Sequence, residues 1–258
     1  MRKETEQRRT ENGSRKIREV RKKPNKEERK TVTRKEENQK MNELKKCAVL
    51  IGAGDIGRQI PVITKNHYVI ALDGGLVFCA ENDITPNMIV GDFDSLPKER
   101  YELLAQYPEE IIVKLPCEKD DTDTLAAIKA AIKKGITDFT IYGGLGGRLS
   151  HTLANIQCLL YLKEHGLYGE LVGDGVKVFL IKEESCVFPS EMSGWISVFS
   201  LSERAEGVII KNLKYEVTDA VLDNTFPVGV SNEFLGKTAE IKVERGVLLI
   251  VIETKACR

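Results

Sequence analysis

The sequence predicts an α/β protein with an all-β second part: an N-terminal, doubly wound, Rossmann-like parallel sheet followed by a C-terminal antiparallel β-sandwich or barrel. Two observations support this fold class. Between residues 47 and 174, short and nearly continuous apolar runs alternate with helical stretches, as in parallel strands covered on both faces. From residue 175 to 258, several runs alternate apolar and polar residues, and Gly, Ser, Asn and Pro separate them.

The first 46 residues differ in composition from the rest of the chain. They hold 18 Lys and Arg, 9 Asp and Glu, and no aromatic residue. Such a segment buries too little apolar surface to offset its ordering entropy, so we predict a disordered basic tail over residues 1–46. It can be an inert extension, an upstream reading-frame extension before a chain start at Met41, or a polyanion-binding arm. Nucleic acid is not the partner we expect.

Six apolar runs of the first half predict parallel strands: residues 48–51, 68–72, 87–90, 110–115, 139–142 and 169–172. Two helices follow from periodicity and end signals. Residues 120–135 start with Asp and Thr, place Leu125 and Ile128 on one face, and stop at Gly135. Residues 151–166 repeat this arrangement.

The runs that predict the strands of the second half are residues 176–181, 195–201, 207–217, 239–244 and 246–254. The six cysteines form no C-x-x-C pair and no zinc-binding spacing, and most lie in or beside apolar runs. We therefore expect buried thiols and a reducing, cytoplasmic setting. No apolar run is long enough to span a membrane, so no membrane partner is expected.

Polar residues follow four of the predicted parallel strands, each at the point where the strand ends. These segments are Asp73-Gly74-Gly75, the sequence GDFDS at 91–95, Lys119 to Asp123, and the glycine-rich run 143–147 with Arg148 and His151. Ligands of open α/β sheets bind at the carboxyl ends of the strands. The sequence therefore predicts a binding site at this edge of the sheet.

The acidic residues of this edge suggest a metal site. Asp92 and Asp94 are two residues apart, so in an extended segment both carboxylates point the same way. Asp123, in the first turn of the next predicted helix, adds a third oxygen ligand. Such ligands suit Mg²⁺, which also binds phosphates. The alternative is that these residues serve turns and helix starts, which Asp favours.

The glycine-rich run 143–147 predicts an anion site, because backbone N–H groups and a helix N-terminus gather there and Arg148 adds a bidentate fork. Lys119 suits a phosphoryl group, or it is a solvated loop lysine. His151 contacts a phosphate or substrate, or it is a satisfied residue at the helix start. Together with a metal site, these features indicate a nucleotide polyphosphate.

A different hypothesis comes from residues 52–57, which have the G-x-G-x-x-G spacing of a dinucleotide-binding turn. Asp73 lies about 20 residues further on, where such sites place a ribose-binding acid. An NAD-dependent oxidoreductase would use Gly52, Gly54, Gly57 and Asp73. It would leave GDFDS and the acids before residue 124 without a role, so it is the weaker hypothesis.

The motifs DGG at 73–75, GDFDS at 91–95, KDDTD at 119–123 and GGLGGRLSHTLAN at 143–155 resemble those of the thiamine pyrophosphokinase (thiamin diphosphokinase) family. The segment GVSNEF at 229–234 resembles a late family segment, and the likeness runs from about residue 47 to the end. The resemblance implies transfer of pyrophosphate from ATP to the hydroxyl of thiamine, giving thiamine diphosphate and AMP. It also implies a homodimer with active sites between subunits. Pyrophosphoryl transfer to another alcohol, such as a pterin, is the alternative.

The resemblance also implies roles for individual residues. Asp92, Asp94 and Asp123 would hold Mg²⁺. The catalytic set would be Asp73, Asp92, Asp94, Lys119, Asp120, Asp123 and Arg148. The nucleotide would contact Gly74, Lys119, Thr122, Gly146, Gly147, Arg148 and His151. Ser231 and Asn232 would lie near thiamine. Ser150 departs from the family, which usually has Asp before the His of this motif; Ser there would also suit a helix N-cap.

Overall fold

The computed structural model describes residues 46–57, 60–93, 98–116 and 120–254, with the backbone alone described for 98–100. Apart from Lys46, the predicted basic tail lies outside these residues. Two of the predicted site residues, Asp94 and Lys119, also lie outside them. The predictions made for these parts of the chain therefore stay predictions.

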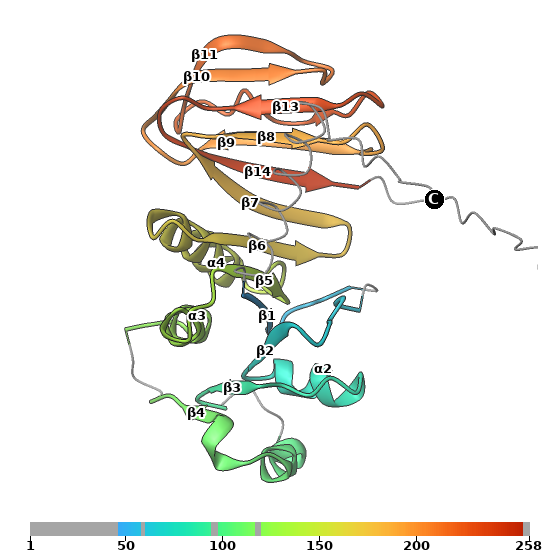
Figure 1. The fold of residues 1–258 in the computed structure, drawn as a ribbon, viewed down its shortest axis with the longest axis vertical. Helices are drawn as coiled ribbons and strands as arrows, with labels where there is room; N and C mark the ends of the chain where they lie inside the picture. Colours follow the sequence, from blue (N-terminus) through green and yellow to red (C-terminus); the bar gives the residue numbers. More distant parts are fainter. Residues whose placement is uncertain (1–45, 58–59, 94–97, 117–119, 255–258) are drawn as a thin grey trace, which may run out of the picture. The chain divides into compact units, whose positions relative to one another are not determined.

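In the described residues the strands form two sheets, of ten and four strands (Figure 1). The larger has the order β12-β9-β14-β7-β6-β5-β1-β2-β3-β4. Its parallel part consists of β1 (Cys47–Ile51), β2 (His67–Leu72), β3 (Met88–Gly91), β4 (Ile112–Lys114), β5 (Asp138–Tyr142) and β6 (Tyr168–Gly173). All six strands predicted for this half are confirmed, with small shifts at their ends.

Helices cover both faces of the parallel part. The helices α3 (Asp123–Lys133) and α4 (Leu149–Glu164) share one hydrophobic cluster with Leu50 of β1. The helix α2 (Gly75–Glu81) and the 3-10 helix η1 (Lys98–Gln106) pack on the opposite cluster, which holds Ile51. A short 3-10 helix, η2 (Glu109–Ile111), leads into β4. The doubly wound arrangement is thus confirmed, although α2 and η1 were not predicted.

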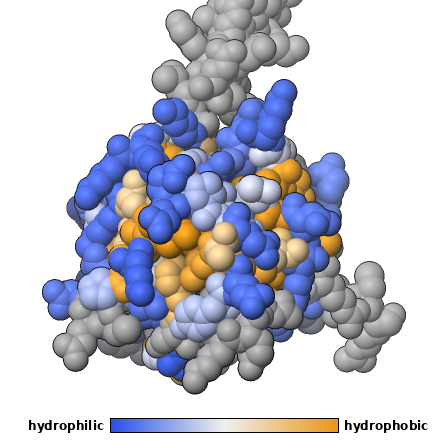
Figure 2. Space-filling model, turned by 90° about the horizontal axis from the view of Figure 1, so that it is seen from below, coloured by the Kyte–Doolittle hydropathy of each residue, from blue (hydrophilic) through white to orange (hydrophobic). Residues whose placement is uncertain are grey.

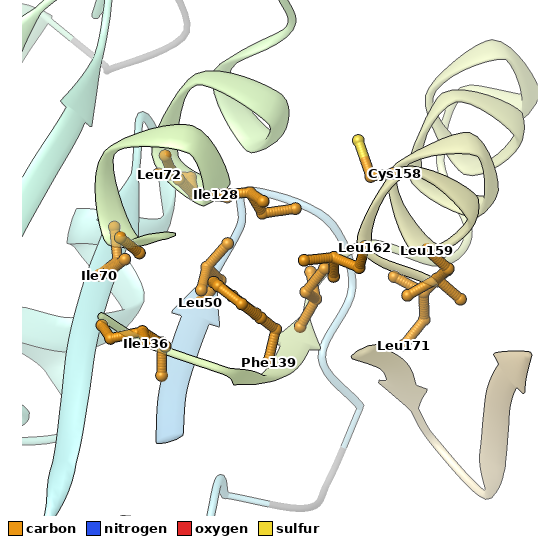
Figure 3. Packing of buried hydrophobic residues seen from close by; sticks show 14 of the residues in the cluster. Leu50, Ile70, Leu72, Ile128, Ile136, Phe139, Cys158, Leu159, Leu162 and Leu171 are labelled. Carbon is orange, nitrogen blue, oxygen red and sulfur yellow. The ribbon is translucent and has the colours of Figure 1, made fainter. Parts of the chain in front are cut away.

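The first cluster anchors α3 and α4 over the centre of the sheet (Figure 3). Leu50 of β1 and Phe139 of β5 lie beneath Ile128 of α3 and Leu162 of α4, and all four side chains are almost completely buried. Burial of each such side chain contributes about 1.5–3 kcal/mol. This packing fixes where both helices begin, which is at the carboxyl ends of the strands.

The second half continues the ten-stranded sheet and adds the smaller one. The strands β7 (Val176–Lys182), β14 (Val247–Glu253), β9 (Trp195–Ser200) and β12 (Asn232–Glu233) extend the large sheet in antiparallel pairing. The small sheet contains β8 (Ser185–Phe188), β10 (Arg204–Lys211), β11 (Val217–Asp223) and β13 (Ala239–Lys242). A third hydrophobic cluster fills the space between the two sheets, which confirms the predicted antiparallel sandwich.

Strand β7 connects the two halves because each of its faces packs on a different core. Val178 and Leu180 belong to the cluster beneath α3 and α4, whereas Phe179 and Ile181 belong to the cluster inside the sandwich. The boundary predicted between residues 174 and 175 falls in the turn of the β6–β7 hairpin, whose strands pair antiparallel. The two halves therefore share one sheet.

One predicted strand of the second half, residues 207–217, is wrong in its extent. Strand β10 ends at Lys211, and Asn212 turns the chain with a φ of 59°. The Asn212 N–H donates to Glu216, and its side-chain amide donates to the carbonyl oxygen of Thr238 over 2.8 Å. Asn tolerates this left-handed backbone conformation, so the apolar pattern continues across a turn. The strands β8, β12 and most of β11 were not predicted.

At one end of the large sheet, the edge strand is β4, which is only three residues long. Viewed from this end, hydrophobic residues gather in the middle of the face and hydrophilic residues surround them (Figure 2). A short edge strand that ends in a lysine, Lys114, discourages pairing with another chain. Among the described helices, none is long and apolar enough to cross a membrane.

Candidate functional site

A cavity of about 650 Å³ opens at the carboxyl ends of the central parallel strands, beside the first turns of α3 and α4. Strand β1 lies between β2 and β5, so the chain leaves the sheet centre in opposite directions at this point. Open α/β sheets bind ligands at such switch points. The residues that line the cavity are Gly52, Ala53, Gly54, Leu72, Asp73, Asp92, Thr122, Asp123, Thr124, Gly143, Gly144, Gly146, Gly147, Arg148, Ser150, His151, Ala154 and Asn155.

The glycines after β1 are explained by a backbone contact with the loop after β5. The Gly52 N–H donates to the Tyr142 carbonyl oxygen over 2.8 Å, and the Gly54 N–H donates to that of Gly143 over 3.2 Å. A Cβ at Gly54 would overlap the Gly143 carbonyl oxygen, and one at Gly143 would lie 2.6 Å from the Gly52 oxygen. The first two glycines of the dinucleotide-like pattern thus serve loop packing.

Asp73 lies at the end of β2, with its side chain against Gly91 of β3. Its N–H donates to the Val90 carbonyl oxygen over 2.8 Å, and its φ is 47°. A Cβ at Gly91 would come within 3.1 Å of the Asp73 Cα, so Gly91 makes room for this aspartate. Gly75 has no side chain, so the first residue of α2 can lie directly against the end of β1. Gly74 is the N-cap of α2 and is not among the described cavity-lining residues.

Asp92 follows β3 and lines the cavity, as predicted. The next residue, Phe93, is buried in the cluster under α2 and η1, and its φ is 65°. Its carbonyl oxygen accepts a hydrogen bond from the Tyr101 hydroxyl over 2.9 Å. The backbone therefore turns at Phe93, and the extended geometry assumed for Asp92 and Asp94 is wrong at this residue. Asp94 lies outside the described residues.

The acidic segment before α3 divides its carboxylates between two tasks. Asp123 lines the cavity from the first helical turn, whereas Asp121 binds Lys129 through both oxygens, at 2.7 and 2.8 Å. This ion pair raises the pKa of Lys129. Asp120 is exposed and is not among the cavity-lining residues, and Lys119 lies outside the described residues. Of the described acids in this segment, only Asp123 lines the cavity as predicted.

Thr122 is the N-cap of α3. Its hydroxyl oxygen accepts a hydrogen bond from the Leu125 N–H over 3.2 Å, and its side chain also bonds with the Cys158 thiol of α4. Burial raises the pKa of Cys158 to about 11, although the hydrogen bond with Thr122 opposes that rise. Thr122 lines the cavity while it holds the start of α3 beside α4.

The glycine loop, residues 143–147, and the start of α4 form the opposite wall of the cavity. Gly146 and Gly147 have φ values of 77° and 61°, which favour glycine. Helix α4 begins at Leu149 with Arg148 as its N-cap, so the interpretation of Ser150 as N-cap is wrong. Ser150 and His151 line the cavity from the first turn. The positive end of the helix dipole and the Arg148 guanidinium make this wall suited to an anion.

The two walls give the cavity mixed electrostatics. The carboxylates of Asp73, Asp92 and Asp123 line it together with Arg148 and the N-terminus of α4. Within the described residues, no group of three His, Cys, Asp or Glu side chains is arranged to hold a metal, and Asp94 lies outside these residues. Carboxylate oxygens are nevertheless the ligands that a hard divalent cation prefers.

Ser231 and Asn232 lie elsewhere, at the β12 edge of the large sheet. Asn232 is only 5% exposed; its amide donates to the Tyr215 carbonyl oxygen over 2.7 Å and accepts from the Tyr215 and Glu233 N–H groups over 2.9 Å. The Ser231 N–H donates to the Ser197 hydroxyl oxygen over 3.1 Å. The described cavity-lining residues include neither of them.

Asn155 was not singled out from the sequence. It lines the cavity, is 8% exposed, and donates through Nδ2 to the Gly144 carbonyl oxygen over 2.8 Å. A signal was available: Asn155, Leu159 and Leu162 are spaced as one helix face, and the two leucines are buried in the core. A polar residue on an apolar helix face needs a hydrogen-bonding partner.

Two family models match this chain. One is described as thiamin pyrophosphokinase, catalytic domain, and covers residues 61–168; the other is described as thiamin pyrophosphokinase, vitamin B1 binding domain, and covers residues 183–248. The thiamine pyrophosphokinase of Bacillus subtilis (strain 168) is 27% identical over 195 residues, which are 72% of this chain and 86% of that protein.

Solved structures share the fold. The thiamine pyrophosphokinase from Bacillus subtilis superposes with a TM-score of 0.71 at 22% identity, over 81% of this chain and 100% of that chain. A thiamin pyrophosphokinase family protein from Enterococcus faecalis gives 0.69 at 25% identity, over 81% and 99%. Yeast thiamin pyrophosphokinase gives 0.65 at 18% identity, over 83% and 90%.

Proposed function

The chain belongs to the thiamin pyrophosphokinase family, and from this premise we propose that it transfers a pyrophosphoryl group from ATP to the hydroxyl of thiamine. The products are thiamine diphosphate and AMP. One observation of this structure carries the proposal: acidic strand ends, a glycine loop and a helix N-terminus with an arginine surround a single cavity. An acidic wall for a metal and a basic wall for phosphate are what a nucleotide polyphosphate needs.

In this reaction the hydroxyl oxygen of thiamine bonds to the β-phosphorus of ATP, and the bond from that phosphorus to the departing AMP oxygen breaks. Negative charge develops on the departing phosphate. Arg148 and the N-terminus of α4 lie in the cavity wall and would offset this charge. The hydroxyl proton passes to a carboxylate, for which Asp73 and Asp123 lie in the cavity and Asp121, bound to Lys129, does not.

The donor set of the cavity fits a hard divalent cation. We propose Mg²⁺, held by Asp92 and Asp123 together with Asp94, which lies outside the described residues. Bound there, Mg²⁺ supplies positive charge to the polyphosphate oxygens. Lys119, also outside the described residues, is proposed as a further cation on the phosphates.

We further propose that the enzyme acts as a homodimer whose sites combine both subunits. Ser231 is the proposed thiamine contact, but β12 and β5 are five strands apart in the sheet, about 24 Å at about 4.8 Å per strand. Thiamine held near β12 of one chain therefore cannot reach the cavity of the same chain. The segments around β12 expose large apolar side chains, among them Tyr215, Phe226 and Leu235, which support an interface there.

A product assay tests the proposed activity. Purified protein is incubated with thiamine, ATP and Mg²⁺, and the mixture is separated by chromatography. Equal amounts of thiamine diphosphate and AMP are expected; a pterin diphosphate in their place would establish the alternative acceptor, and absence of both products would refute the proposal. Omitting the metal should stop the reaction if the cation is required.

Mixing of inactive variants tests the shared site. Asp92→Asn damages the cavity of its own chain, and Ser231→Arg blocks the thiamine face of its own chain. If sites combine two subunits, a mixed dimer holds one site with neither change, so activity should return when the two inactive proteins exchange subunits. No recovery, although light scattering shows a dimer, would place both substrates on one chain.

The described cysteines bear on the compartment. Cys79, Cys158 and Cys186 are free thiols, and Cys79 and Cys158 are buried in the core. Free thiols are usual in a reducing environment. We therefore propose a cytoplasmic location, which the distribution of a tagged protein in fractionated cells would test.

A further inference from the structure

Two side chains of α4 donate hydrogen bonds to the glycine loop. The Asn155 amide donates to the carbonyl oxygen of Gly144 over 2.8 Å, and the Thr152 hydroxyl donates to that of Gly146 over 3.3 Å. The two residues are three apart, so they lie on the same side of the helix. Both hydrogen bonds end on loop carbonyls, and neither residue has a role in the proposal above.

A third loop carbonyl is held from the other side, because Gly143 accepts from the Gly54 N–H over 3.2 Å. The carbonyls of residues 143, 144 and 146 are therefore all bound to the surrounding frame. In a planar trans peptide, the C=O of one residue and the N–H of the next point in opposite directions. No peptide bond of the described residues is cis. The N–H groups of Leu145 and Gly147 consequently point away from Asn155 and Thr152.

Packing around the loop differs along its length. Gly144 is buried, and a Cβ there would lie 3.3 Å from the Asn155 amide nitrogen, so loop and helix are in close contact. Around Gly146 and Gly147, a Cβ would meet no described atom within 4 Å. Side-chain packing thus cannot define the peptide planes at the open end of the loop. Hydrogen bonds from α4 are the contacts available to do so.

We propose that Asn155 and Thr152 are positioning residues that orient the glycine loop so that it offers N–H groups, rather than carbonyls, to the polyphosphate of ATP. This inference rests on the proposed function and adds residues to its nucleotide side. Successive N–H groups at one place form an anion-binding concavity, and a carbonyl rotated into it repels phosphate. The proposed thiamine contact is Ser231 and not this loop, so the binding of thiamine should be unaffected.

The experiment measures ATP and thiamine separately in the full-length protein. The dissociation constant of ATP is measured by calorimetry without thiamine, and KM values are measured for both substrates. The variants are Asn155→Ala, Asn155→Asp, Thr152→Val and Thr152→Ser. Asn82→Ala is the matched control, because the Asn82 amide also donates to a helix carbonyl, that of Phe78, over 2.9 Å at the far end of α2.

Misplacement of a binding group by about 1 Å costs about 100-fold, so we expect the Asn155 variants to raise the Kd of ATP by about 10- to 100-fold. The isosteric variant Asn155→Asp should bind ATP at least as weakly as Asn155→Ala does, because its carboxylate faces the Gly144 carbonyl oxygen. Thr152→Val should show a smaller rise, consistent with its longer bond, and Thr152→Ser should restore wild-type affinity. The KM of thiamine should stay unchanged.

Three results would overturn the proposal. The first is wild-type ATP affinity in a folded Asn155→Ala protein, and the second is an equal loss in Asn82→Ala. If the Asn155 variants do not fold, the Thr152 pair decides, and equal affinities of Thr152→Val and Thr152→Ser refute the role. Failure of the enzyme to make thiamine diphosphate would refute the proposed function instead, since the ATP-binding arm contains no thiamine.

Discussion

The backbone of Gly54 rests directly on that of Gly143. The Gly54 N–H donates to the Gly143 carbonyl oxygen over 3.2 Å, and a side chain at residue 54 would overlap that oxygen. Gly54 is not among the residues with positive φ, so its backbone conformation suits any amino acid. The contact alone requires glycine, and it joins the loops after β1 and β5 at the cavity wall.

Gly54→Ala should therefore separate the two loops and reduce activity. We expect a loss of about 1–3 kcal/mol in the free energy of unfolding, as for other overpacked sites, and a higher Kd for ATP because the glycine loop moves. Urea unfolding and calorimetry measure the two effects. Gly166→Ala is the control. The φ of Gly166 is 70° and its surroundings are open, so this variant should be less stable but should bind ATP with unchanged affinity. Equal ATP affinity of both variants would contradict the role of the contact.

The acids before α3 and after β3 should differ sharply in their effect on turnover. Asp92→Asn and Asp123→Asn remove cavity carboxylates, and we expect kcat to fall about 100-fold or more, since charge stabilisation by a metal is worth several kcal/mol. Asp121→Asn removes only the partly exposed ion pair with Lys129 and should change kcat by no more than about twofold. Steady-state kinetics at saturating Mg²⁺ measure this, and a loss at Asp121 as large as at Asp92 would be contrary to the assignment.

Replacement of Arg148 should raise the KM of ATP and leave the stability of the fold unchanged. Its side chain makes no capping hydrogen bond and the residue is exposed, so its replacement leaves the fold unchanged. Lysine keeps the charge but loses the planar fork, and we expect Arg148→Lys to raise the KM of ATP by about tenfold, with a larger rise for Arg148→Ala. Thermal unfolding and kinetics distinguish the effects. A lowered Tm in Arg148→Lys would show that the arginine also supports the structure.

Stability should fall in alkaline solution because of buried thiols. Burial raises the pKa of Cys79 from 9.0 to about 12 and that of Cys158 from 9.0 to about 11. Above pH 9 the unfolded chain releases thiol protons that the folded chain retains, so this stability is complete below pH 9 and is lost as pH rises toward 11 and 12. The free energy of unfolding should decrease by up to about 1.4 kcal/mol per pH unit for each thiol.

Urea unfolding at about pH 8 and about pH 10 measures this slope. The double variant Cys79→Ala/Cys158→Ala is less stable at either pH, because it removes buried volume. Its stability should nevertheless depend less on pH than that of the wild-type chain. Identical slopes in the two proteins would show that other groups cause the alkaline loss.

The parallel strands could be predicted because burial on both faces leaves a signature in the residues themselves. Leu50 and Ile51 point to opposite cores, so the whole run 48–51 is apolar. Helix α2 gave no comparable signal, since it is short and starts at two glycines with no capping side chain. The turn at Asn212 was hidden because the apolar pattern of β10 resumes beyond it.

Most of the cavity could also be predicted, because parallel strands deliver their carboxyl ends to one edge. Asp73, Asp92, Asp123 and Arg148 meet there. Their detailed geometry could not be predicted, since it depends on local backbone turns such as the left-handed Phe93. The difference between Asp121 and Asp123 was equally hidden, because it depends on Lys129, which lies eight residues after Asp121.

The double packing of β7 limits how the two halves of this enzyme can be recombined. The family-model matches end at residue 168 and resume at residue 183, which invites exchange of segments between relatives at that junction. A crossover there divides a hydrogen-bonded hairpin, and a transplanted β7 must match the helices on one face and the small sheet on the other. Chimeras that keep β6, β7 and β14 from one parent preserve both interfaces and should be the ones that fold.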